Sequence, residues 1–206
     1  SYLGYLASSK GLSYQKAVQV IIGSPLKHNY ENCRRSTSTM QIPASFSFSC
    51  DAIDSGTGSG PYDTLIVTEG NNGIANKRTY SDTDEYVARY LEQFKSRNAS
   101  GRMLLFTSWE ALPTYGSDWL NRQAEDLAQY EDIARVSAQI AASRGMTGTV
   151  EIIPVNIALR DLIIQVERGG ISGVTSRSDV FMDDVHMTRL GNYYVACVVF
   201  STVYGR

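Results

Sequence analysis

Residues 64–72 read TLIVTEGNN, a short apolar run followed directly by turn-forming residues. A nearly continuous run of this kind, rich in β-branched residues, predicts a strand that is covered on both of its faces. Similar runs lie at residues 17–22, 103–107 and 150–154. Because strands covered on both faces are typical of parallel sheets, the four runs predict a parallel sheet.

Segments with helical periodicity separate these runs. Residues 82–95 carry apolar side chains at spacings of three and four, which makes one face of a helix apolar. Residues 119–143 repeat the pattern over a longer range, and Gly145 follows as a natural helix end. Further helices are expected at residues 2–10, 156–167 and 188–204. Strands that alternate with helices are typical of an α/β fold.

The composition limits the classes of function. The 206 residues, 43% of them hydrophobic and 19% charged, suit one globular domain over residues 1–206. A formal net charge of -2 offers no basic face, so we expect no nucleic-acid partner. The longest apolar runs, such as residues 195–200, are far shorter than the roughly 20 residues of a membrane-spanning helix. Because His28, His186 and the three cysteines show no metal-ligand spacing, we expect no metal and no other cofactor.

A long loop is predicted at residues 35–60, which are rich in Ser, Thr and Gly and have no steady period. Cys33 and Cys50 could form a disulfide across this loop; three reduced thiols, with Cys197 in an apolar run, are an equally weighted alternative. A loop of this composition with two cysteines favours a secreted or periplasmic location.

The strongest chemical signal is the run DDVHMTRLGN at residues 183–192, directly before the last predicted helix. A carboxylate three residues ahead of a histidine can accept a hydrogen bond from Nδ1, which fixes the tautomer in which Nε2 is a base. Asp183 and His186 are therefore candidates for an acid and base pair. An exposed histidine beside ordinary acidic residues at a helix start is the alternative interpretation.

Two further signals follow predicted strands, at the sheet edge where α/β proteins bind ligands. Gly23 follows residues 17–22, and residues 70–72 read GNN after residues 64–68. Together with Asp183 and His186, and in this order, they give the chain a pattern that resembles the SGNH, or GDSL-like, hydrolase superfamily. That family has a serine after its first strand, a glycine after the second, a Gly-x-Asn turn after the third and a C-terminal Asp-x-x-His.

The resemblance implies a three-layer α/β/α fold with a central parallel sheet, of the flavodoxin-like SGNH type. It also implies that His186 is the general base and then the general acid, oriented by Asp183. The Gly23 backbone N–H and the Asn72 side chain would form the oxyanion hole, with Asn71 as the other candidate for that donor.

The chain departs from the family pattern because no Gly-Asp-Ser block precedes Gly23. Three positions for the nucleophilic serine remain open. The first lies upstream of Ser1, and the second is Ser1 itself at a predicted helix start. The third is Ser24, although Pro25 after it has no N–H to donate to an oxyanion.

The resemblance implies a serine-type carboxylic ester hydrolase, with an acetylated saccharide or another small-molecule ester as substrate. The same groups could transfer the acyl group to an alcohol instead of water, as an O-acyltransferase does. A catalytically inactive SGNH-like binding domain is the alternative from another class, and the missing serine block favours it. A flavodoxin-like nucleotide binder is disfavoured because no glycine-rich phosphate loop follows a strand.

Overall fold

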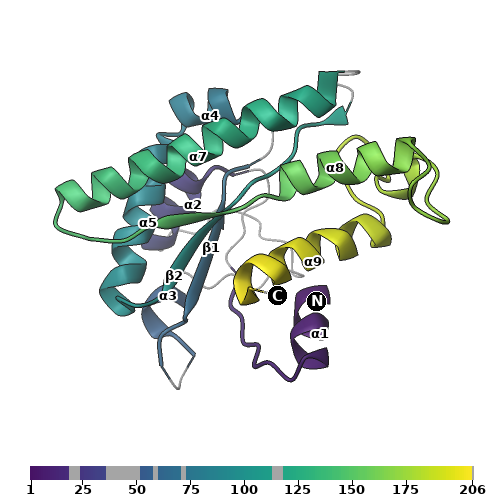
Figure 1. Cartoon of the computed structure of the whole chain (residues 1–206). Helices are drawn as coiled ribbons and strands as arrows, with labels where there is room; N and C mark the ends of the chain where they lie inside the picture. The colour runs from purple at the N-terminus through teal and green to yellow at the C-terminus, as the bar shows by residue number, and fades with distance from the viewer. Residues whose placement is uncertain (19–23, 36–51, 58–59, 71–72, 113–117, 206) are drawn as a thin grey trace. The chain divides into compact units, whose positions relative to one another are not determined.

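The structure is a computed structural model (Figure 1), and it describes residues 1–18, 24–35, 52–57, 60–70, 73–112 and 118–205. The chain divides into two compact units. We call the first the sheet unit, and it comprises Gln15–Phe106 and Gln129–Ile152. The second, the terminal unit, comprises Ser1–Tyr14, Thr107–Ala128 and Ile153–Arg206.

A three-stranded sheet in the order β1-β2-β3 is found among the described residues. Its strands are β1 (Thr64–Thr68), β2 (Arg102–Phe106) and β3 (Val150–Ile153). β1 runs parallel to β2, with Thr64 opposite Arg102 and Thr68 opposite Phe106. The α/β class and three of the predicted strands are thereby confirmed, each strand to within one residue. The fourth prediction, residues 17–22, lies largely outside the described residues.

The sheet unit buries one apolar core between its strands and α5 (Thr83–Arg97). The residues of α5 that face this core follow the spacing that predicted the helix: Tyr86, Val87, Tyr90, Leu91 and Phe94. α5 also packs against three shorter helices, which are α2 (Leu26–Arg35), α3 (Ala52–Ser55) and α4 (Ile74–Tyr80). The sequence patterns did not predict α2 or α4, and α3 lies within the predicted loop at residues 35–60.

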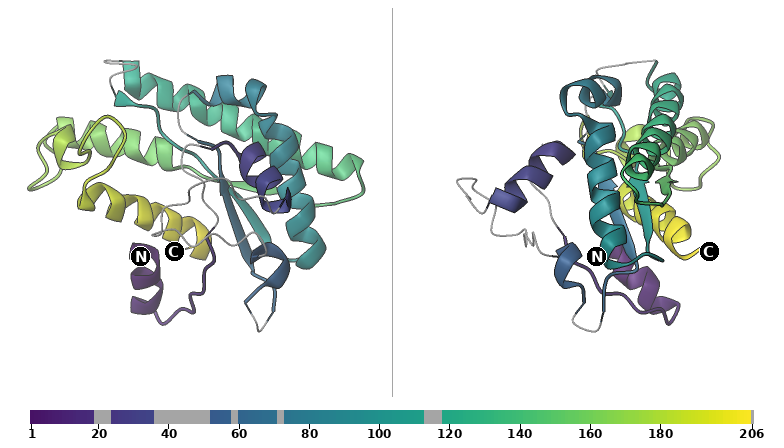
Figure 2. Two further views of the ribbon diagram at one scale, coloured as in Figure 1. Left: turned by 180° about the vertical axis from the view of Figure 1, so that it is seen from behind. Right: turned by 90° about the vertical axis from the view of Figure 1, so that its left-hand side faces the viewer.

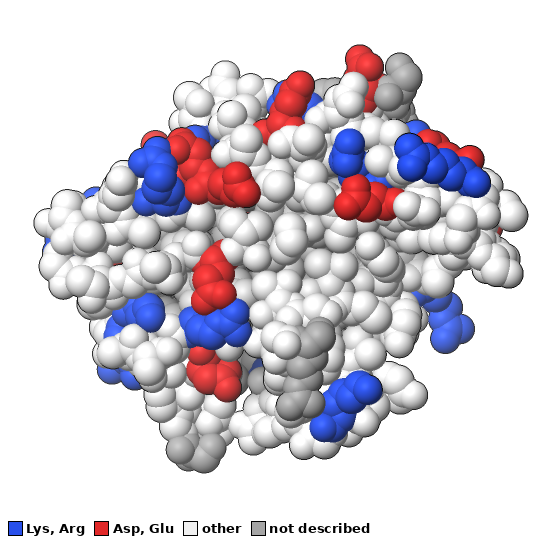
Figure 3. Space-filling view, in the orientation of Figure 1, with Lys and Arg blue, Asp and Glu red and all other residues white. Residues whose placement is uncertain are grey.

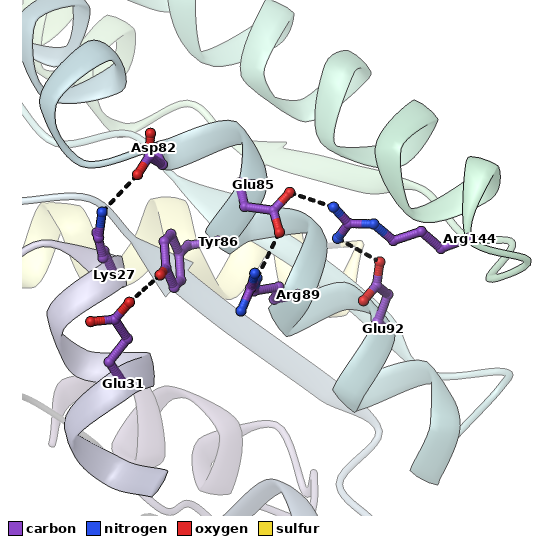
Figure 4. Close-up of polar contacts among 8 residues, drawn as sticks. All are labelled: Lys27, Glu31, Asp82, Glu85, Tyr86, Arg89, Glu92 and Arg144. Carbon is purple, nitrogen blue, oxygen red and sulfur yellow. Dashed lines mark hydrogen bonds and ion pairs between the residues drawn. The ribbon is translucent and has the colours of Figure 1, made fainter. Parts of the chain in front are cut away.

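Ion pairs cover the polar side of α5 and its neighbours. On the face drawn in Figure 3, blue Lys and Arg side chains lie beside red Asp and Glu side chains in several places. Figure 4 shows two links from α2, one to Asp82 at the N-cap of α5 and one to Tyr86 within α5. Lys27 Nζ lies 2.7 Å from Asp82 Oδ2, and the Tyr86 hydroxyl donates to the Glu31 carboxylate. These contacts hold α2 in the orientation in which its Leu26 is buried in the core.

The terminal unit is helical. It contains α1 (Tyr2–Ser9), the first part of α7 (Trp119–Ser143), α8 (Val155–Glu167) and α9 (Arg189–Tyr204). The four helices predicted at these places are confirmed to within one residue at each end. α9 packs against α1 and α8 (Figure 2). None of the helices in the described ranges has the length and apolar character needed to cross a membrane.

Candidate functional site

Asp183 and His186 lie in a tight turn of the terminal unit, directly before α9. Phe181 and Met187 pair as an antiparallel bridge on either side of the turn. Met182 N donates to the His186 carbonyl at 2.8 Å and closes it. The turn therefore brings the side chains of Asp183 and His186 to the same side, which an isolated Asp-x-x-His sequence does not guarantee.

The Asp183 carboxylate is held by three donors. His186 Nδ1 lies 2.8 Å from Asp183 Oδ2, and Oδ1 accepts the backbone N–H groups of His186 (2.7 Å) and Val185 (2.9 Å). The His186 N–H, the Val185 N–H and the imidazole, in that order, lower the pKa of Asp183 to about 2. An ionised Asp183 favours the tautomer of His186 with the proton on Nδ1. The His186 side chain is 72% exposed, so its imidazole is open to solvent.

The loop after β2 supports this turn through two hydrogen bonds. Trp109 Nε1 donates to the Val185 carbonyl at 2.9 Å, and Leu112 N donates to the Asp184 carbonyl at 3.0 Å. Trp109 follows the end of β2 by three residues. No local sequence signal could have linked it to a turn 76 residues later.

Gly191 allows α9 to begin close to the turn. Thr188 caps the helix, because its Oγ1 accepts the Gly191 N–H at 3.2 Å. A Cβ atom on Gly191 would lie 2.4 Å from the Val180 carbonyl oxygen and 3.0 Å from Met187 Cβ. This close approach explains why residue 191 is a glycine.

The loop after β2 is itself anchored in a buried polar network of the terminal unit. The Thr107 hydroxyl donates to Asn156 Oδ1 at 2.7 Å, and Asn156 Nδ2 donates to the Gln123 carbonyl at 2.8 Å. Trp119 Nε1 donates to the Glu110 carbonyl at 2.7 Å. These contacts hold the first residues of the loop against α7 and α8.

Two carboxyl groups, Glu110 and Asp126, are buried beside this loop. Asp126 is 1% exposed, and its Oδ1 lies 3.2 Å from Arg122 Nε. Burial raises the pKa of Asp126 to about 7, Arg122 opposes that rise, and Glu110 adds to it. A separate polar pocket at the start of α7 has a volume of about 410 Å³ and is lined by Asp118, Asn121, Arg122 and Glu125.

The predicted oxyanion hole lies outside the described residues, since Gly23, Asn71 and Asn72 are not among them. The residue that follows β1, Glu69, is described and is 1% exposed. Its Oε1 accepts the N–H groups of Leu26 and Gly70, both at 3.1 Å. Burial raises the pKa of Glu69, and these hydrogen bonds oppose the rise. Glu69 thus ties the start of α2 to the turn after β1.

The two candidate serines within the chain have different surroundings. Ser24, in the sheet unit, has its Oγ 3.2 Å from His28 Nδ1. Ser1 caps α1, because its Oγ accepts the Gly4 N–H at 3.2 Å, and it lies 3.4 Å from the Tyr14 hydroxyl. Ser1 lies in the same unit as His186, and its described hydrogen bonds are with Gly4 and Tyr14.

A metal centre would need several ligands in one place. Among the described residues, no group of three or more His, Cys, Asp or Glu side chains is arranged to hold a metal ion. Cys197 is a partly buried free thiol in α9, and the Cys33–Cys50 pairing falls on side chains outside the described residues.

Comparison with known proteins gives no relative. No protein-family model, curated protein or solved structure matches the chain.

Proposed function

We propose that the protein is a serine-type carboxylic ester hydrolase with an SGNH-like, three-layer α/β/α fold. The observation that carries the proposal is the Asp183–His186 pair, in which an ionised carboxylate holds Nδ1 and leaves Nε2 exposed. An imidazole arranged in this way is suited to take a proton from a hydroxyl and return it to a leaving group.

The reaction proceeds through an acyl-enzyme. His186 Nε2 takes the serine hydroxyl proton while the serine oxygen attacks the ester carbonyl. The tetrahedral intermediate collapses, the C–O bond to the alcohol breaks, and the alcohol leaves with the proton from His186. A water molecule, deprotonated by the same nitrogen, then releases the acid and restores the serine. Gly23 and Asn72 are the proposed oxyanion donors, and acetylated saccharides are the proposed substrate class.

The first test is hydrolysis of p-nitrophenyl acetate by the chain and by three variants. We expect His186→Ala to abolish hydrolysis and Asp183→Asn to lower kcat by roughly 10³- to 10⁴-fold, because the introduced amide does not favour the required tautomer. Asp184→Asn, at the exposed acid next to Asp183 in the same turn, is the matched control and should retain activity. Hydrolysis that survives His186→Ala would contradict the assignment.

The nucleophile can be identified in the same experiment. A fluorophosphonate reacts covalently with an activated serine, and peptide mass spectrometry then locates the modified residue. Labelling of Ser1 or Ser24 that depends on His186 would identify the nucleophile within residues 1–206. A chain that neither hydrolyses the ester nor reacts with the fluorophosphonate would favour either a nucleophilic serine upstream of Ser1 or the inactive binding domain.

A further inference from the structure

The two backbone N–H groups that hold Asp183 belong to peptide planes that are also held from their other side. A trans peptide group is planar, and its C=O and N–H point in opposite directions. The Val185 carbonyl and the His186 N–H share one plane, and the Asp184 carbonyl and the Val185 N–H share the plane before it. Holding each carbonyl therefore sets the direction of the N–H that points at Asp183.

Both carbonyls are held by the loop after β2. Trp109 Nε1 donates to the Val185 carbonyl at 2.9 Å, on the plane whose N–H reaches Asp183 Oδ1 at 2.7 Å. Leu112 N donates to the Asp184 carbonyl at 3.0 Å, on the plane whose N–H reaches the same oxygen at 2.9 Å. Hydrogen bonds linked in this way through a peptide group polarise one another.

The donors are fixed because the loop has its own anchors. Glu110 lies between Trp109 and Leu112, and its carbonyl accepts the Trp119 indole N–H at 2.7 Å. The Trp119 ring is fully buried, and Phe181, at the edge of the Asp183–His186 turn, packs edge-to-face on it with ring centroids 6.0 Å apart. The loop and the turn therefore share a rigid apolar support in the terminal unit.

We propose that Trp109 is a positioning residue for the Asp183–His186 pair, acting through the Val185–His186 peptide plane. The catalytic consequence rests on the proposed esterase function, but the structural consequence does not. Without the Trp109 N–H, the Val185–His186 plane is free to rotate. The His186 N–H then leaves Asp183 Oδ1, and Asp183 no longer holds Nδ1 in one orientation.

The test compares Trp109→Phe with Tyr194→Phe. Trp109→Phe keeps an aromatic ring and removes the N–H. Tyr194→Phe is the matched control, since it removes one side-chain hydrogen bond to a backbone carbonyl, that of Ala158 at 3.0 Å, elsewhere in the same unit. The readouts are the pKa of Asp183 from its carboxyl ¹³C shift and the tautomer of His186 from its ring ¹⁵N shifts.

In Trp109→Phe we expect the pKa of Asp183 to rise from about 2 toward 3.8, and the Nδ1–H form of His186 to lose population. Tyr194→Phe should change neither. If the esterase function holds, kcat should fall about tenfold or more in Trp109→Phe while KM stays within about twofold. An unchanged Asp183 titration in Trp109→Phe, or an equal change in Tyr194→Phe, would overturn the proposal.

A second variant covers the case in which Trp109→Phe does not fold. Benzothienylalanine, incorporated at position 109 alone, has nearly the shape of tryptophan and lacks only the N–H donor. The same rise in the pKa of Asp183 is expected, and its absence would overturn the proposal. A rise in a chain with no esterase activity would support the positioning role and contradict the proposed function alone.

Discussion

The chemistry of Asp183 depends on how many donors its carboxylate meets within the turn. The carboxylate accepts three hydrogen bonds, one from the Val185 N–H and two from the N–H and the imidazole of His186. Three donors stabilise the charged form, so the pKa of Asp183 falls to about 2. The carboxylate thus stays ionised at neutral pH.

Gly191→Ala is expected to destabilise the junction between the turn and α9. The added Cβ would meet the Val180 carbonyl oxygen at 2.4 Å, and neither backbone can move without loosening the bridge at Met187. We expect the free energy of unfolding to fall by about 1–3 kcal/mol, as for other overpacked sites. Urea unfolding followed by circular dichroism measures it.

The control for this substitution is Ser201→Ala, an exposed position in the same helix. It should leave the midpoint of unfolding nearly unchanged. A Gly191→Ala variant as stable as the control would mean that the start of α9 can shift away from Val180 at little cost.

At the scale of elements, α2 and α5 differ in how far their sequences specify them. α5 carries an apolar face over 15 residues, with Asp84 and Glu85 in its first turn and Lys95 and Arg97 in its last. Those charges oppose the ends of the helix dipole and favour the helix independently of its surroundings. α2 has few apolar residues, and its position depends on contacts such as that between Glu69 and the Leu26 N–H.

Arg78 links three helices of the sheet unit, and Arg78→Gln tests that link. Its Nη2 lies 2.9 Å from Asp84 Oδ2 in α5 and 2.8 Å from Asp132 Oδ2 in α7. Because the Arg78 side chain is only 21% exposed, we expect its loss to lower the free energy of unfolding by about 1 kcal/mol. Urea unfolding at low and high salt should show a smaller loss at high salt.

Arg135→Gln is the matched control for Arg78. Arg135 pairs with the same Asp132, but it is more exposed and lies on the same helix as its partner. No measurable loss of stability is expected there. Equal losses in the two variants would show that an ion pair between separate helices adds no more to the free energy of unfolding than one within a helix.

At the scale of the whole molecule, buried carboxyl groups in both units make the stability of the protein depend on pH. The pKa of Asp126 rises from 3.8 to about 7, and that of Glu69 also rises. An acid whose pKa is raised on folding contributes fully to the free energy of unfolding at pH values below its pKa in the unfolded chain. That contribution is lost as the pH rises through its pKa in the folded chain. The pKa of Asp183 is lowered, so its contribution is lost in the opposite direction, as the pH falls toward 2.

We expect Asp126→Asn to raise the melting temperature at pH 7 to 8 and to flatten its decline between about pH 4 and 7. The physical reason is that the introduced amide avoids placing a buried charge as the pH rises. Differential scanning calorimetry across this range measures the effect. Glu131→Gln, at an exposed position of the same helix, should keep the wild-type decline. If Asp126→Asn showed the wild-type pH dependence, the decline of the melting temperature would come from another group.

The sequence by itself determined the elements whose signal is local. Apolar runs located β1, β2 and β3, and periodicity located α5 and α7, because each of these elements carries its buried face in its own residues. The spacing of Asp183 and His186 also made them a predictable candidate pair, but the turn closed by the Phe181–Met187 bridge is what brings the two side chains together.

Only the tertiary structure decided the contacts between distant segments. α2 was not predictable because Glu69, 43 residues after Leu26, satisfies its first N–H. The role of Trp109 was not predictable because its indole donates to the distant Val185 carbonyl. The raised pKa of Asp126 was not predictable either, since it requires burial beside Glu110. Hydrogen bonds and desolvation act through space, so a single sequence carries no period or spacing that announces them.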